Sequence, residues 1–298
     1  MADPFPILQL RVDSPDVIEQ LGSKPKFWFR MEPDEQPWLF KFTRENTGED
    51  WSEKIASEVG RLLQVPVPHV ELAEFMGKRG CASRSFVETK KGFDLIHGSE
   101  VLAGRVLGYD KQKQWHQSNH SIKNIITAVE NTFPDRQQIL QLRTLAGFIV
   151  LDALICNTDR HHDNWAFLRG PGPKGKTVHS IAPSFDHASS LGRELRDDRR
   201  KLMLAQNAVE RYALKGHGAI YWQENDEKGE NPLLLAIKAA GMYPNYFKPW
   251  LARVRELRPE DFCGIIDRVP VEWMSSDAKQ FCAQLISVTV AKLRAVEL

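Results

Sequence analysis

Two short stretches decide how this 298-residue sequence is interpreted: Asn157-Thr-Asp159-Arg-His-His-Asp-Asn164 and Ser184-Phe-Asp186-His187. In the first, an aspartate and an asparagine lie five residues apart, directly after a long apolar segment. In the second, another aspartate follows one predicted hairpin further along. Metal-dependent phosphoryl transfer uses such a set, in which one carboxylate orients and deprotonates the attacking hydroxyl while an amide and a second carboxylate hold Mg²⁺. Together the two stretches indicate phosphotransferase chemistry.

Neither motif is specific by itself. Asp and Asn are common at helix ends and in turns, and an aspartate five residues before an asparagine occurs by chance in many chains. For that pair alone, a structural role is the better interpretation. The correctly spaced Asp186, with its apolar neighbour Phe185, shifts the balance toward catalysis.

The composition is that of an ordinary globular protein. Hydrophobic residues make up 42% and charged residues 27%, and the length suits two modest domains or one bilobed unit. The net charge of +1 gives no general attraction to nucleic acid or to an anionic membrane. No apolar run is expected to be long enough to span a bilayer.

The four cysteines are scattered and form no CxxC pair, so a zinc knuckle is not expected: Cys81, Cys156, Cys263 and Cys282. Scattered thiols are typical of a reducing compartment. The first six residues, Met-Ala-Asp-Pro-Phe-Pro, lack the basic and apolar regions of a signal peptide. We therefore expect a cytoplasmic location.

Residues 1–88 are predicted to form a small β-rich lobe with one helix. The helix covers residues 51–63, where apolar side chains recur with helical spacing, and the prolines that follow end it. A turn is expected at residues 34–37, between two aromatic strands. The expected strands are residues 26–30, 37–42, 69–75 and 82–88.

Residues 89–298 are predicted to form a larger, mostly helical lobe. The clearest helix covers residues 136–155 and ends at the first motif. A turn-rich segment joins two short predicted strands, residues 164–168 and 177–181. Further helices are expected over residues 232–240, 244–257, 259–268 and 277–296, and a solvated loop over 224–232. The fold class is thus α+β, with two lobes and a cleft between them.

Lys41 lies in the middle of the aromatic segment Trp38-Leu-Phe-Lys-Phe42. It either faces solvent or reaches into a cleft, and alternation alone leaves both open. In kinases such a lysine contacts the nucleotide phosphates and pairs with a glutamate on a helix. Glu53 and Glu58 lie on the next predicted helix, and for each of them a solvated helix face is the ordinary alternative.

A third candidate segment is Gly22-Ser-Lys-Pro-Lys26. Its glycine, serine and lysines can cradle phosphate through backbone N–H groups and charge. It lacks the full GxGxxG pattern and is not a Walker loop, so an ordinary surface turn is an equal alternative.

The histidines suggest a rival interpretation, a metal-dependent hydrolase. Imidazole and carboxylate groups are suitable ligands, and several cluster in the sequence: Asp159, His161, His162, Asp163, Asp186 and His187. However, adjacent histidines usually point apart, and the chain has no HExxH helix. This interpretation ranks below the kinase.

In these segments the chain resembles the HipA-like serine/threonine kinase family, whose members have a bilobed, protein-kinase-like fold. The similarity spans most of the sequence. Its most specific part is the pair of motifs at residues 157–164 and 184–187. It rests on residues 22–26, 38–42, 51–60, 83–87, 157–164 and 182–187.

The resemblance implies a role for each candidate. Asp159 would be the catalytic base, and Asn164 and Asp186 would bind Mg²⁺. Lys41 would hold the ATP phosphates, with Glu53 as the helix glutamate. The other cofactor-binding residues are then Gly22, Ser23 and Lys26 in the phosphate loop, the hinge residues Ser85, Phe86, Val87 and Glu88, and His161.

ATP and Mg²⁺ are the implied cofactors, and a protein substrate and an antitoxin or other regulator are the implied partners. Neither a membrane nor direct binding of nucleic acid is expected. Three departures weigh against control by loop phosphorylation and against antitoxin pairing. The sequence is expected to begin close to the kinase lobes, with little room for the extra N-terminal subdomain of the longer members. Lys24 replaces the family's loop glutamine, and Glu19 and Leu21 stand where some members carry phosphorylated serines.

The expected function is therefore transfer of the ATP γ-phosphate to a Ser or Thr hydroxyl, on a protein. The alternatives are a pseudokinase-like nucleotide-binding or interaction module, a small-molecule or lipid kinase on the same scaffold, and the metal hydrolase. Residues 193–231 follow Asp186 as an activation segment would, so we expect them to select the substrate.

Overall fold

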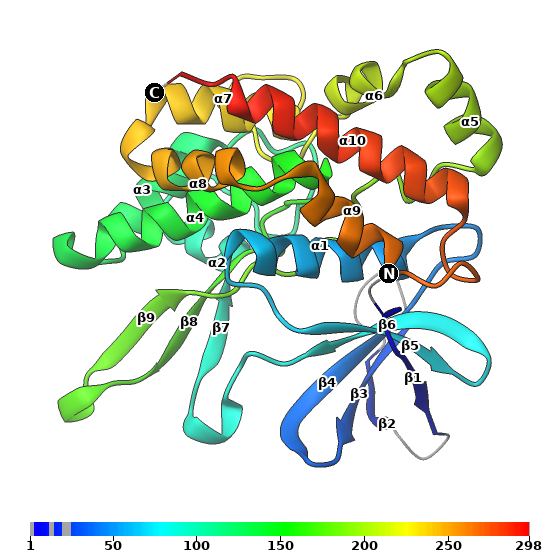
Figure 1. The fold of residues 1–298 in the computed structure, drawn as a ribbon. Coiled ribbons are helices and arrows are strands. Elements are labelled where there is room, and N and C mark those ends of the chain that lie inside the picture. Colours follow the sequence, from blue (N-terminus) through cyan, green and yellow to red (C-terminus); the bar gives the residue numbers. More distant parts are fainter. Residues whose placement is uncertain (1–2, 12–14, 20–24, 298) are drawn as a thin grey trace.

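In a computed structural model of the chain, the described residues are 3–11, 15–19 and 25–297. The small lobe is a six-stranded sheet in the order β1-β5-β6-β4-β3-β2, with helix α1 packed against it (Figure 1). Strands β1 and β5 are parallel, and the other pairs are antiparallel. The elements are β1 Ile7–Leu10, β2 Pro15–Glu19, β3 Lys26–Met31, β4 Asp34–Phe42, α1 Glu49–Leu63, β5 Val70–Phe75 and β6 Lys78–Arg84.

The aromatic residues of β3 and β4 explain which way Lys41 points. Phe27, Phe29 and Phe40 are buried in one cluster on one face of the sheet. The rings of Phe27 and Phe40 lie 5.1 Å apart between centroids. Because successive side chains of a strand point to opposite faces, Lys41 projects from the other face, into the cavity between the lobes.

Helix α1 is buried on nearly all sides. It lies between the sheet and the helices of the larger lobe (Figure 1), and among its residues only Arg61 is exposed. Glu53 is 2% exposed, and Glu58 is mostly buried with its carboxylate 2.8 Å from Lys54 Nζ. The solvated face considered for these glutamates is therefore absent, because both layers of the protein cover the helix.

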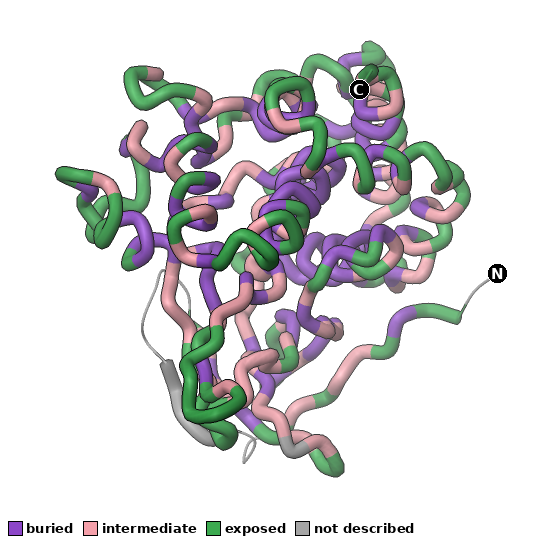
Figure 2. Tube along the Cα trace, turned by 90° about the vertical axis from the view of Figure 1, so that its left-hand side faces the viewer, coloured by how far each residue is buried: buried purple, intermediate pink, exposed green. Residues whose placement is uncertain are grey.

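The larger lobe is built around α4, Asp135–Ile155, which packs against α3, α7, α8 and α10. Figure 2 shows the buried part of the chain running through the middle of this lobe, with exposed loops and helix ends outside it. The helices are α2 Gly98–Ala103, α3 Ile122–Glu130, α5 Asp197–Ala205, α6 Val209–Lys215, α7 Pro232–Met242, α8 Pro244–Glu256, α9 Pro259–Asp267 and α10 Ser276–Arg294, with short 3₁₀ turns η1 Thr89–Lys91 and η2 Pro173–Gly175.

Contrary to the expectation that no apolar run could span a bilayer, α4 is long and apolar enough to do so by length and composition. Its most apolar 18-residue window is 72% buried inside the protein. Packing in the core therefore accounts for its hydrophobicity.

A second, three-stranded sheet begins after the hinge residues and packs against α2 and α4 of the larger lobe. It consists of β7 Asp94–His97, β8 Ala166–Pro171 and β9 Thr177–Ile181, in that order and antiparallel. The two later strands were predicted, but β7 was not. It has only four residues, two of them polar at its ends, and it is held by pairing with β8 more than 60 residues later in the chain.

Other local predictions were wrong at their boundaries. The turn between β3 and β4 is at Glu32 and Pro33, not at residues 34–37, and β4 begins at Asp34. Asp34 accepts hydrogen bonds from Trp38 Nε1 at 3.0 Å and from Arg84 of the neighbouring strand, so it belongs to the sheet. Strand β6 ends at Arg84, and residues 85–88 form a connection instead. Strands β1 and β2 were not predicted.

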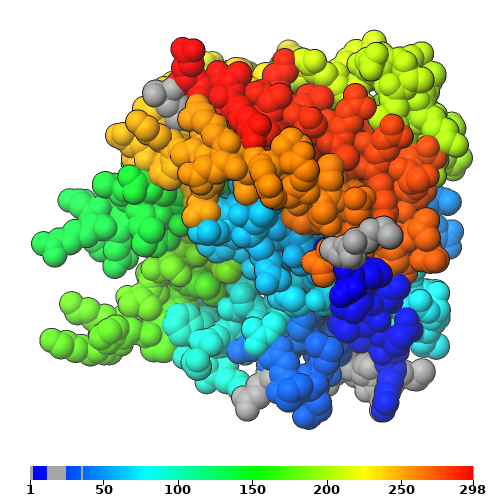
Figure 3. Space-filling view, in the orientation of Figure 1, coloured from blue at the N-terminus to red at the C-terminus, as the bar shows by residue number. Residues whose placement is uncertain are grey.

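Several contacts tie the small lobe to the helical lobe at the edge away from the hinge, among them the following. The backbone N–H of Phe5 donates to the carbonyl of Arg268 at 2.7 Å, beside α9. The guanidinium of Arg79 on β6 lies 2.9 Å from the buried Asp50 carboxylate and stacks over Trp273. In Figure 3 the blue N-terminal segment lies directly against the orange atoms of this region.

Candidate active site

A cavity of about 1170 Å³ lies between the lobes. It is larger than the roughly 300–1,000 Å³ typical of small-molecule sites, so it has room for a nucleotide and part of an acceptor. Its wall is formed by β3, β4, α1, the hinge, the loop after α4 and the segment after β9. Predicted site residues on this wall are Lys26, Lys41, Glu53, Ser85, Phe86, Val87, Asp159, His161, Asn164 and Asp186.

Asp159 and Asn164 are brought together by the loop that follows α4. Cys156 ends the helix with a left-handed backbone, φ 53°. Asn157 then donates to Asp152 Oδ1 at 2.8 Å and accepts from the Asp159 N–H at 3.1 Å. Asn164 Nδ2 donates to the Asp159 carbonyl at 2.6 Å. Because the amide nitrogen is committed to the backbone, the amide oxygen is the end that can act as a ligand.

Arg160 was not predicted as a site residue, yet it holds this loop in place. It is 5% exposed and makes a two-pronged ion pair with Asp152 on α4, at 2.8 and 2.7 Å. It also donates to the carbonyls of Asn164 and Phe185. Burial opposes its charge, but the pairing with Asp152 raises the pKa of Arg160 above its usual value. One guanidinium thus links the Asp159 loop to the Asp186 loop.

The sequence did contain a signal for Arg160. Asp152 falls on the apolar stripe of the predicted helix, and a carboxylate on a buried face needs a cation or several hydrogen-bond donors. Arg160 is one of the few cations close by in the sequence.

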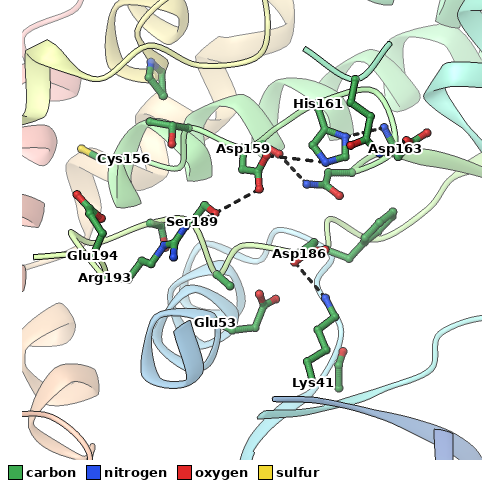
Figure 4. A pocket seen from close by; sticks show the side chains of 18 of the residues that line it. Lys41, Glu53, Cys156, Asp159, His161, Asp163, Asp186, Ser189, Arg193 and Glu194 are labelled. Carbon is green, nitrogen blue, oxygen red and sulfur yellow. Dashed lines mark hydrogen bonds and ion pairs between the residues drawn. The ribbon is translucent and has the colours of Figure 1, made fainter. Parts of the chain in front are cut away.

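Asp186 and Lys41 form an ion pair across the cavity. Lys41 Nζ lies 3.0 Å from Asp186 Oδ1, as Figure 4 shows. Asp186 has a left-handed backbone, φ 59°, a conformation that Asp tolerates better than most residues and that is frequent at functional sites. Although burial opposes it, the carboxylates of Asp186 and Glu53 raise the pKa of Lys41 above its ordinary value, so the lysine is a cation.

Glu53 projects from α1 toward the same pair (Figure 4). Its Oε1 lies 3.6 Å from His187 Nδ1, and within the described residues its buried Oε2 has no hydrogen-bond partner. Burial opposes ionisation, but His187 and Lys41 lower the pKa of Glu53, so it is a carboxylate. The resemblance implied a Lys41–Glu53 pair, whereas here Asp186 holds the lysine.

His187 connects Glu53 to Arg160 and was not expected to do so. It is 1% exposed, and its Nε2 lies 2.8 Å from Ser184 Oγ. Arg160 donates to the same hydroxyl at 2.8 Å, so the Ser184 proton points to His187 Nε2. The imidazole proton is then on Nδ1, facing Glu53. The two functional loops and α1 are therefore joined by buried polar contacts.

The hinge follows β6. The Ser85 N–H donates to the Pro37 carbonyl at 2.8 Å, and the Val87 N–H donates to Ser85 Oγ at 3.2 Å. The ring of Phe86 packs 5.7 Å from that of Phe185, next to Asp186. Glu88 is not on the cavity wall, and its carbonyl accepts from the N–H groups of residues 91 and 93. Its contact with adenine stays a prediction.

His161 lies beside the proposed base. Its Nδ1 accepts from the Asp163 N–H at 3.2 Å, so Nε2 carries the proton and lies 3.8 Å from Asp159 Oδ1. Burial lowers the pKa of His161, which favours the neutral ring. In the described part of the chain, no three His, Cys, Asp or Glu side chains come together as a metal site of the hydrolase type. Gly22 and Ser23 lie outside the described residues.

Comparison with known proteins agrees with this geometry. Residues 20–237 match the HipA-like C-terminal domain family. The chain belongs to this family. The match covers most of the sequence and includes the motifs at residues 157–164 and 184–187. The HipA-like resemblance indicated by the sequence is therefore confirmed.

A kinase named CtkA matches this HipA-like chain both in sequence and in structure. It is 27% identical over 145 residues to the serine/threonine-protein kinase CtkA of Helicobacter pylori J99; this covers 47% of the chain and 40% of the relative's length. The crystal structure of the H. pylori proinflammatory kinase CtkA superimposes with a TM-score of 0.73 and 20% identity, over 91% of this chain and 92% of that one.

A second structure, Shewanella oneidensis HipA in complex with HipB and operator DNA, matches with a TM-score of 0.60 and 14% identity, over 97% of this chain and 69% of that one. At these identities the structural matches establish the fold. The predicted α+β, bilobed, kinase-like architecture of this HipA-like chain is therefore confirmed.

Proposed function

We propose that this chain is an ATP- and Mg²⁺-dependent kinase that transfers the γ-phosphate to a Ser or Thr hydroxyl of a protein. The observation that carries the proposal is the convergence of Lys41, Asp159, Asn164 and Asp186 on one interlobe cavity. The membership in the HipA-like family and the kinase name of its H. pylori relative support the same chemistry.

The residues present fit the proposed cofactors. The Asn164 amide oxygen and the Asp186 carboxylate are the hard oxygen ligands that Mg²⁺ prefers, and they lie on adjacent loops joined by Arg160. When bound, the metal would neutralise phosphate charge. Lys41, a cation at the same wall, would hold the phosphates, and the hinge from Ser85 to Val87 would face the adenine.

Asp159 would accept the proton of the attacking hydroxyl. Its loop is fixed at both ends, by Asn157 before it and by Asn164 after it, so little reorganisation is needed to orient an acceptor. Catalysis would then consist of positioning and electrostatic stabilisation, with no covalent intermediate on the protein.

The test uses labelled ATP with the purified chain and a cell lysate, comparing the wild type with Asp186→Ala and Asp159→Asn. We expect a labelled protein band with the wild type alone. Asp159→Asn should bind Mg-ATP normally by calorimetry while turnover falls by about 10²- to 10⁴-fold. Wild-type transfer by Asp159→Asn would remove Asp159 as the base.

The same experiment separates the alternatives. A pseudokinase-like module would bind Mg-ATP and label nothing, whereas a small-molecule kinase would label only the low-mass fraction. Since HipA was solved with HipB, we also propose that this chain has a protein regulator, to be sought by co-purification from its own host.

A further inference from the structure

Ser189 touches the proposed catalytic base. Its hydroxyl donates to Asp159 Oδ2 at 3.2 Å, and Figure 4 shows this bond directly. Ser189 follows Asp186 by three residues and lies on the cavity wall. It was not among the predicted site residues. A carboxylate that receives a directed hydrogen bond is held in one rotamer, and the mechanism proposed above needs such a fixed base.

The hydroxyl of Ser189 is itself held by an arginine. Arg193 Nη2 donates to Ser189 Oγ at 3.3 Å, and Arg193 Nη1 lies 2.9 Å from Glu49 Oε1, in the first turn of α1. Glu49 is almost fully buried, and Arg193 is 19% exposed. A hydrogen-bonded chain therefore runs from Glu49 through Arg193 and Ser189 to Asp159.

Backbone hydrogen bonds lie beside this series of side-chain contacts and hold both of its ends. The Gly48 N–H donates to the Arg193 carbonyl at 2.9 Å, and the Thr158 N–H donates to the Ser189 carbonyl at 3.3 Å. One turn further along α1, Ser52 Oγ lies 2.8 Å from Ser190 Oγ. The segment after Asp186 is therefore attached to α1 on one side and to the Asp159 loop on the other.

We propose that Ser189 and Arg193 are positioning residues for the base, and that they couple the orientation of Asp159 to helix α1 through Glu49. This inference rests on the proposed kinase function. In this arrangement Arg193 uses one end of its guanidinium for Glu49 and the other for Ser189. Neighbouring side chains thus supply an anchor for this segment.

The contacts favour positioning over a second role, in which Ser189 would itself receive phosphate. Its hydroxyl is engaged on both sides, as an acceptor from Arg193 and as a donor to Asp159. Its carbonyl is held by Thr158. To attack a γ-phosphate, the serine would have to give up these bonds.

The first arm of the test measures transfer from labelled ATP to two generic acceptors, casein and myelin basic protein. Ser189→Ala should lower kcat about tenfold and leave the KM for ATP within about twofold, because the nucleotide-binding groups are untouched. Ser189→Thr, which keeps the hydroxyl, should restore most of the rate. Ser180→Ala, a partly buried serine on β9, is the matched control.

The second arm does not depend on activity. Hydrogen exchange of the intact protein is compared between Arg193→Met and the control Arg211→Met, an exposed arginine on α6. If Arg193 couples the two regions, exchange should speed up in Arg193→Met both at residues 44–52 and at residues 157–164, and neither region should change in Arg211→Met.

The outcomes are distinct. If the wild type labels neither these acceptors nor any protein of the cell lysate, the proposed function fails, and the exchange arm still decides the coupling. If the wild type is active and Ser189→Ala equals it, or if Ser189→Thr is as impaired as Ser189→Ala, the positioning role is wrong. Accumulation of a phosphate on Ser189 by mass spectrometry would also overturn it, as would unchanged exchange at residues 157–164 in Arg193→Met.

Discussion

Lys41 of β4 is paired with Asp186, with 3.0 Å between Nζ and Oδ1, and Glu53 of α1 faces His187 instead. The lysine is thus shared electrostatically by two carboxylates, of which Asp186 holds it directly. If Asp186 bound Mg²⁺ instead of Lys41, the buried Oε2 of Glu53 would be the next acceptor for the Lys41 ammonium group.

Replacing the lysine tests this arrangement. Lys41→Met should weaken Mg-ATP binding by roughly 10- to 100-fold, the range expected for losing a hydrogen bond to a charged group. Lys41→Arg should recover only part of the loss, because the longer, planar cation does not reproduce a point charge. Isothermal calorimetry measures the change, with Lys78→Met, an exposed residue of the same sheet, as control. Unchanged affinity in Lys41→Met would contradict the assignment.

His187 makes two contacts that can be removed one at a time. In His187→Asn the amide nitrogen takes the place of Nδ1 and keeps the contact with Glu53. In His187→Gln the longer amide takes the place of Nε2 and keeps the contact with Ser184. If the Glu53 contact positions the active site, kcat should fall roughly tenfold in the Gln variant and less in the Asn variant. Steady-state kinetics at saturating Mg-ATP decides, and the reverse order would refute this role for Glu53.

The Arg160–Asp152 pair should dominate local stability. Arg160→Met leaves a buried carboxylate without its cation and should cost about 3–5 kcal/mol of unfolding free energy. The double variant Arg160→Met, Asp152→Leu removes both charges and should recover much of that loss. Urea denaturation gives both values. A double variant no more stable than Arg160→Met would mean that Arg160 acts mainly through its bonds to the two loops.

His120 predicts an acid-sensitive fold. Its Nδ1–H donates to the Ala219 carbonyl at 2.8 Å, and its Nε2 accepts from Trp165 Nε1 at 3.1 Å, so a second proton on the ring would face an N–H donor. Burial lowers the pKa of His120 to about 3, whereas in an unfolded chain it is about 6.5.

Between these two pH values the unfolded chain binds a proton that the folded chain does not. The contribution of His120 to stability is therefore complete above about pH 6.5 and is lost as the pH falls, by about 1.4 kcal/mol per pH unit. Urea denaturation at pH 7.0, 6.0 and 5.0 measures how the free energy of unfolding changes with pH. In His120→Gln this slope should be smaller by about 1.4 kcal/mol per pH unit, which corresponds to one proton. An equal slope in the two proteins would show that His120 is not the group responsible.

The sequence predicted those residues of the candidate site that stand out by local spacing, and the structure places them on one cavity wall. Asp159 and Asn164 were found because they lie on one loop after a strongly periodic helix. Lys41 was found because it interrupts an aromatic strand. The side of the sheet on which Lys41 projects was not predictable. It depends on which face the phenylalanine cluster occupies, because Lys41 points from the opposite face.

The contacts that organise the site were missed because they join distant parts of the chain. Glu49 and Arg193 are 144 residues apart, and Ser52 and Ser190 are 138 apart. Each side chain alone is an ordinary polar residue on a helix or in a loop. Strand β7 was missed for a similar reason, because its stability comes from pairing with β8 and not from its own composition.

The burial of α1 also limits how the cleft can be controlled from outside. Arg61 is the single exposed residue of α1, so this helix has no accessible surface to which an effector could bind. A binding partner that alters turnover would therefore have to act through elements other than α1, such as the segment after Asp186. In a saturation mutagenesis screen, α1 should accordingly behave as core along its whole length, without the permissive stripe that an amphipathic surface helix displays.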